Sequence, residues 1–98
     1  VLSGDLHGGG ISSSAAVGVA LLLAFQHANG VAVSPEENVR LVSAIENGYL
    51  GLKIGILDQS AILFSRRDRL TRIDCRTAGH ELISPGSGLP PFAVVLAF

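Results

Sequence analysis

Three parts of the chain carry residues whose types and spacing could bind and transfer a phosphoryl group. The first is the stretch from Gly8 to Ser14, where glycines and serines run directly into an apolar segment with helical character. A helix N-terminus presents free N–H groups and a partial positive charge, and glycines let an anion approach that backbone closely. The stretch lacks the Gly-Lys-Ser/Thr of a P-loop, and Ser13 stands where a dinucleotide-binding loop has its third glycine. It is therefore either a phosphate-binding loop or a glycine turn with a serine cap.

The second part is a carboxylate within an apolar stripe. Glu46 follows Val39 and Val42 and precedes Tyr49 at spacings of three, four and three residues, which is one face of a helix. A desolvated carboxylate is costly unless it is paired or binds a metal. Glu46 is accordingly a metal ligand or a residue at the edge of the stripe that reaches water.

The third part is Asp58, which lies among five apolar residues: Ile56, Leu57, Ala61, Ile62 and Leu63. Such an aspartate is either a cap or turn residue or a functional acid. Two partly buried acids downstream of a phosphate-binding loop are what magnesium-assisted phosphoryl transfer requires.

Helices and strands that would position these residues can be predicted from local signals. A helix apolar nearly all round is expected from Ser13 to about Ala28, which is typical of a buried core helix. A second helix, with Ser34 as its cap and Pro35 at its first position, should run to about Leu50. Strands are expected at 1–6, 61–64, 70–75 and 92–98, with 61–64 and 70–75 joined as a hairpin through 65–69. The predicted fold class is α+β.

Composition limits the classes of protein to which the chain can belong. Of its 98 residues 48% are hydrophobic and 15% charged, and the mean hydropathy of +0.49 favours a partial domain within a larger protein. A net charge of −1 gives no electrostatic case for a nucleic-acid or anionic-membrane partner. The apolar run of residues 15–25 is too short to span a bilayer. A single cysteine, Cys75, indicates a reducing compartment, so a cytoplasmic location is expected.

Three motifs together resemble the GHMP kinases, the family of galactokinase, homoserine kinase, mevalonate kinase and phosphomevalonate kinase. The stretch GGGISSSAA resembles the second conserved motif of that family, and its Ser-Ser-Ser-Ala order is most like galactokinase and related sugar kinases. The segment ENGYLGLKIGILDQ resembles the Glu…Gly…Gly-Ile-Met-Asp-Gln run of the family, with twelve positions from Glu46 to Asp58. The segment IDCRT resembles the strand that follows that run in galactokinases.

The resemblance implies an ATP-dependent sugar kinase that uses magnesium and acts on a small sugar, as in galactose metabolism. Ser14 and Glu46 would hold the magnesium ion, and Asp58 would be the catalytic residue that faces the sugar hydroxyl. The implied fold is two-lobed, with a first lobe like a ribosomal-protein domain and helices packed on a mixed sheet. Residues 1–98 would be a central fragment of it, inactive alone. The residues implied to bind the ATP phosphates are Gly8, Gly9, Gly10, Ile11, Ser12, Ser13 and Ser14.

Departures from the family pattern leave the acceptor open. Leu6-His7 stands where a proline is usual, Lys53-Ile54 replaces Pro-Cys, and Leu57 replaces Met. Rival acceptors to galactose are arabinose, a uronic acid or another GHMP substrate. A non-catalytic sugar or nucleotide sensor is a further alternative, against which the retained Glu46 and Asp58 argue.

Overall fold

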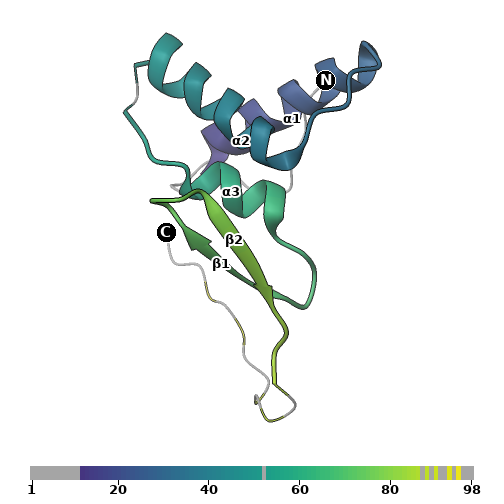
Figure 1. Cartoon of the computed structure of the whole chain (residues 1–98), viewed down its shortest axis with the longest axis vertical. Coiled ribbons are helices and arrows are strands. Elements are labelled where there is room, and N and C mark those ends of the chain that lie inside the picture. The colour runs from purple at the N-terminus through teal and green to yellow at the C-terminus, as the bar shows by residue number, and fades with distance from the viewer. Residues whose placement is uncertain are drawn as a thin grey trace.

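The computed structural model describes residues 12–51 and 53–86, together with residues 88, 90, 93 and 95. The described elements form an α+β arrangement, which confirms the predicted class (Figure 1). They are, in chain order, α1 (Ser13–Ala28), α2 (Pro35–Ala44), the π-helix η1 (Ile45–Tyr49), α3 (Leu57–Phe64), β1 (Leu70–Asp74) and β2 (Gly79–Ile83). Within the described ranges the sheet has two antiparallel strands, so the mixed sheet and the second lobe stay predictions. The strand predicted at 1–6 and most of that at 92–98 lie outside the described residues.

Helix α3 lies between the α1–α2 pair and the β1–β2 hairpin, and it contacts all of α1, α2 and β1 (Figure 1). Gln26 of α1 donates to the Asn38 carboxamide oxygen of α2 at 2.6 Å, a side-chain link between these two helices. The apolar core is small and comes from three helices: Ala15, Val19, Val39, Val42 and Phe64.

Helix α1 has the predicted bounds but not the predicted burial. It ends at Ala28, with Asn29 as its C-cap and Gly30 in the left-handed conformation that stops a helix. Only Ala15 and Val19 are buried, whereas Phe25 is 66% exposed. The prediction of a helix buried all round is therefore wrong for this chain, because α2 and α3 cover only one face. No helix among the described residues is long and apolar enough to cross a membrane.

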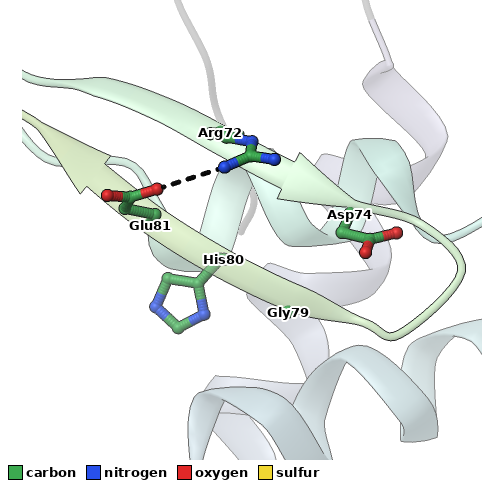
Figure 2. A pocket seen from close by; sticks show the side chains of 5 residues that line it. All are labelled: Arg72, Asp74, Gly79, His80 and Glu81. Carbon is green, nitrogen blue, oxygen red and sulfur yellow. Dashed lines mark ion pairs between the residues drawn. The ribbon is translucent and has the colours of Figure 1, made fainter.

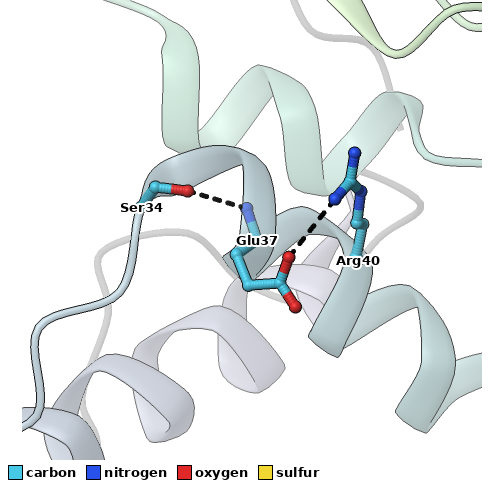
Figure 3. A network of polar contacts seen from close by, with 3 residues as sticks. All are labelled: Ser34, Glu37 and Arg40. Carbon is cyan, nitrogen blue, oxygen red and sulfur yellow. Dashed lines mark hydrogen bonds and ion pairs between the residues drawn. The ribbon is translucent and has the colours of Figure 1, made fainter.

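Helix α2 begins as its sequence signals predict. The Ser34 hydroxyl accepts a hydrogen bond from the Glu37 backbone N–H at 3.2 Å, and Pro35 occupies the first turn, where its missing N–H costs nothing (Figure 3). The Glu37 carboxylate pairs with Arg40 at 3.4 Å on the exposed surface. These contacts fix where α2 starts, and therefore which residues of α2 face α1.

Replacing Ser34 with alanine should lower the free energy of unfolding by about 1 kcal/mol, because one N–H group at the start of α2 loses its acceptor. The matched control is Arg40→Gln, which removes the exposed ion pair with Glu37, leaves the first turn of α2 unchanged and should cost less than about 0.5 kcal/mol. Urea unfolding followed by circular dichroism measures both. Equal losses for the two variants would contradict the capping role.

The hairpin is formed by different residues from those predicted. Residues 61–64, expected to be a strand, are the second half of α3, and β1 pairs instead with β2 through the turn at 75–78. Four consecutive apolar residues do not distinguish a buried helix from a strand, which explains the error. Cys75, the last residue of the strand predicted at 70–75, is therefore an exposed residue of this turn. His80 of β2 stacks on the buried Phe64 ring, with 3.8 Å between ring centroids, and attaches the hairpin to α3.

Candidate active site

A cavity of about 520 Å³ lies between α1 and the α2–η1 segment. Two residues of the predicted phosphate loop line it, Ser13 and Ser14, and so does the predicted metal ligand Glu46. The fold thus brings together residues that are more than thirty positions apart in the sequence. The rest of the lining is almost entirely apolar: Val17, Gly18, Leu21, Val42, Ile45 and Leu50.

The start of α1 lacks the serine cap that the alternative interpretation requires. Ser12 occupies the N-cap position in a left-handed conformation, with φ of 56°, and its hydroxyl makes no capping hydrogen bond. Its carbonyl accepts the first helical bond, from the Ala16 N–H at 3.0 Å. In the described part of the chain no side chain caps this end, which is the condition under which a helix N-terminus attracts an anion. Gly8, Gly9, Gly10 and Ile11 lie outside the described residues.

Glu46 is buried, which overturns the alternative in which it reaches water. Its side chain lies in η1 with 3% of the residue exposed, close to the fully buried Val42. One carboxylate oxygen, Oε2, accepts a hydrogen bond from the Gln59 side-chain amide. The other, Oε1, has no hydrogen-bond partner among the described residues, and Glu46 makes no ion pair with them. A buried carboxylate oxygen without a partner is suited to a cation.

The π-helix at Glu46 was not anticipated from the sequence. The Leu50 N–H donates to the Ile45 carbonyl at 3.1 Å, five residues back, so this turn is wider than an α-helical one. Tyr49, expected on the same stripe as Glu46, is 86% exposed because the wider turn rotates it off that face. Gly48, a poor helix former inside the segment, is the one sequence signal for this irregularity. Such π-turns occur often at functional sites.

Asp58 does not line the cavity. It lies in the first turn of α3, half-buried, where the helix dipole favours a negative charge. It is not a cap, because Ile56 holds that position without any side-chain capping bond. The next residue, Gln59, is fully buried and contacts Glu46, so α3 connects the two acidic residues that the sequence singled out. Gln59 itself was given no role from the sequence, because its contact is formed only by tertiary packing.

A second hollow, of about 230 Å³, lies on the hairpin and is formed by charged side chains that already have partners (Figure 2). Arg72 of β1 pairs with Glu81 of β2 at 3.5 Å. Hydrogen bonds from the Arg76 backbone N–H and the Thr77 side chain hold the pKa of the Asp74 carboxyl below its ordinary value. These contacts stabilise an exposed hairpin and its turn, so we assign these side chains a structural role.

The described residues include no group of three or more His, Cys, Asp or Glu side chains that could hold a metal alone. Magnesium is commonly held in a different way, by one or two protein ligands together with substrate phosphates. A cavity with one buried carboxylate and two serines at a helix N-terminus fits that second mode.

Similarity to known proteins extends over the predicted loop and both acidic residues. The family model described as GHMP kinases N terminal domain matches residues 2–66. The chain is 55% identical to a galacturonokinase of Arabidopsis thaliana over 98% of its own length, and 37% identical to a galactokinase of Roseiflexus over 91%. It is 34% identical to a galactokinase of Pyrococcus furiosus over 84%. It spans 22% to 24% of the length of these relatives. No solved structure matches the chain.

Proposed function

The chain belongs to the GHMP kinase family, and on that premise we propose that it forms the phosphate- and magnesium-binding part of an ATP-dependent sugar kinase. The observation that carries this proposal is the buried Glu46, which lines the same cavity as two serines at the start of α1 and whose Oε1 has no partner among the described residues. Relatives named galacturonokinase and galactokinase, which align along most of the chain, support a sugar as the acceptor.

Binding of the ATP phosphates is assigned to residues 8–14. The N–H groups at the start of α1, which no described side chain caps, and the Ser13 hydroxyl would donate hydrogen bonds to phosphate oxygens. These donors are held on a 16-residue helix, so they are fixed in place before the nucleotide binds.

Ser14 and Glu46 are the residues that would hold magnesium. The fit rests on the Glu46 oxygen that has no partner among the described residues and on a serine that lines the same cavity, since magnesium prefers oxygen ligands. When bound, the ion would offset the negative charge of the phosphates. Burial of Glu46 limits water around its carboxylate, and this strengthens the attraction of the carboxylate for a cation.

Asp58 is assigned to the acceptor. Its carboxylate would orient the sugar hydroxyl and take its proton while the hydroxyl oxygen forms a bond to the γ-phosphorus. The bond from that phosphorus to the bridging oxygen breaks, and ADP leaves. A sensor would need no proton acceptor at this position, so we prefer a kinase to a non-catalytic binding protein.

The acceptor proposed here is a uronic acid, because the galacturonokinase shares 55% of aligned residues against 37% for the Roseiflexus galactokinase. Galactose is the second candidate, in agreement with the motif order around Ser14 and with those galactokinases. Both acceptors use the same phosphate and metal residues of this chain, so the choice affects the sugar and not the reaction type.

Exchanging this chain into two relatives tests the proposal. In the exchange enzyme, defined as the Arabidopsis galacturonokinase with its matching segment replaced by these 98 residues, galacturonate-dependent ATP consumption should stay within about tenfold of the parent. If the segment is adapted to uronic acids, the same exchange into the Roseiflexus galactokinase should lower its galactose-dependent ATP consumption by more than about a hundredfold. Coupled ADP release with galacturonate, glucuronate, galactose and arabinose measures both.

Two outcomes would contradict these proposals separately. A folded exchange enzyme with no sugar-dependent turnover would remove the kinase assignment and favour the sensor. Equal activity of the segment in both hosts would leave the kinase assignment intact and remove the preference for a uronic acid.

A further inference from the structure

Two polar side chains, Glu46 and Gln59, are buried together where η1 meets α3, and Ser60, the next residue in the sequence, is buried as well. Glu46 is 3% exposed, Gln59 is fully buried and Ser60 is 1% exposed. The Gln59 amide nitrogen donates to Glu46 Oε2 across a separation of 13 residues. Glu46 Oε1, Gln59 Oε1 and the Ser60 hydroxyl have no hydrogen-bond partner among the described residues. A buried polar group with so few internal partners requires an explanation, because unsatisfied groups of this kind are rare in folded proteins.

We propose that Gln59 is a positioning residue that holds the Glu46 carboxylate for a divalent cation, an inference that rests on the proposed function. A carboxylate can turn about its last torsion, so an oxygen faces a cation reproducibly only if the other oxygen is fixed. The Gln59 amide fixes Oε2 and leaves Oε1, on a residue that lines the cavity, without a partner among the described residues. Complete burial of Gln59 fixes its own rotamer in turn.

The chemistry of the donor supports this role. An arginine or lysine would also fix the carboxylate, but its charge would offset that of Glu46 and weaken the attraction for a cation. The glutamine amide is neutral, so it orients Glu46 without reducing the negative charge. The assigned direction of the amide is the attractive one, because the reverse would bring its carbonyl oxygen against a carboxylate oxygen.

Gln59 also links the two segments that carry Asp58 and Glu46. It follows Asp58 directly on α3, whereas Glu46 lies in the π-helix. The amide–carboxylate bond therefore holds the segment with the proposed proton acceptor against the segment with the proposed metal ligand. Loss of the bond should change the affinity for the cation first, since the cation contacts Glu46 directly.

Replacement of Gln59 by methionine in the exchange enzyme tests the proposal, since methionine has a similar length and no donor. The readout is binding of manganese in the presence of ATP, measured from the electron paramagnetic resonance signal of free Mn²⁺, with no turnover needed. The dissociation constant should rise about tenfold, the usual effect of removing a group that supports a metal ligand. Ser60→Ala is the matched control, because it removes a neighbouring buried hydroxyl that bonds to nothing described, and binding should stay within about twofold.

A second variant keeps the test decisive if the methionine protein does not fold. Gln59→Asn retains the amide but shortens its reach, and it should weaken manganese binding by at least about threefold. Equal binding by the folded Gln59 variants and Ser60→Ala would overturn the positioning role. Glu46→Gln separates this failure from that of the proposed function. If the Glu46→Gln variant binds manganese as the parent does, the assignment of Glu46 as a metal ligand is overturned. If Glu46→Gln weakens binding and the Gln59 variants do not, only the positioning role of Gln59 is overturned.

Discussion

Replacing Asp58 with asparagine should lower kcat of the exchange enzyme by roughly two to four decades, the range expected when a positioned proton acceptor is removed. Asparagine has nearly the same shape and keeps an oxygen that can accept a hydrogen bond from the sugar, but it cannot take the proton. Asp58 does not line the cavity that holds Glu46 and Ser14, so the affinity for ATP should change little. The measurement is steady-state turnover with galacturonate, with nucleotide binding determined separately by calorimetry.

The control for this prediction is Asp68→Asn, which removes an equal charge at a distant position. Asp68 lies in the turn between α3 and β1, exposed and in a left-handed conformation that asparagine also tolerates. Its kcat should equal that of the exchange enzyme. If Asp58→Asn retains more than about a third of the parent kcat, Asp58 is not the proton acceptor.

Helix boundaries could be predicted because their signals are local. Ser34 and Pro35 mark the start of α2 through one hydrogen bond and one missing donor, both formed by residues that are adjacent in sequence. The end of α1 follows similarly from Asn29-Gly30, whereas its start at Ser13 has no side-chain cap among the described residues. The hairpin could not be predicted in this way, because the run at 61–64 suits a helix or a strand and only contacts with α1 and α2 decide between them.

Glu46 could be singled out from the sequence as an unusual carboxylate, but its contacts could not be predicted. Glu46 stands out from the apolar residues around it, and the structure buries it. Gln59 carries no such signal, because its hydrogen bond to Glu46 depends on how η1 meets α3. The π-turn is equally invisible to a search at a period of 3.6 residues, which wrongly placed Tyr49 on the buried face.

The central claim is that Glu46 is a magnesium ligand, and Glu46→Gln should raise the magnesium concentration needed for half-maximal rate by about a hundredfold. Removing a group that only supports a metal ligand weakens metal binding by up to about a hundredfold, and removing the ligand itself should have at least that effect. The substitution keeps the size of the side chain and an oxygen that the Gln59 amide can donate to, so the fold should persist. Glu81→Gln, which removes an exposed carboxylate paired with Arg72 on the hairpin, is the matched control.

The decisive measurement is a magnesium titration of turnover at fixed, saturating ATP for the exchange enzyme and these two variants, with thermal unfolding midpoints recorded alongside. A buried carboxylate that binds the ion predicts a displaced curve for Glu46→Gln, an unchanged curve for Glu81→Gln, and similar midpoints for all three proteins. Superimposed titration curves for Glu46→Gln and the exchange enzyme would show that Glu46 does not bind magnesium.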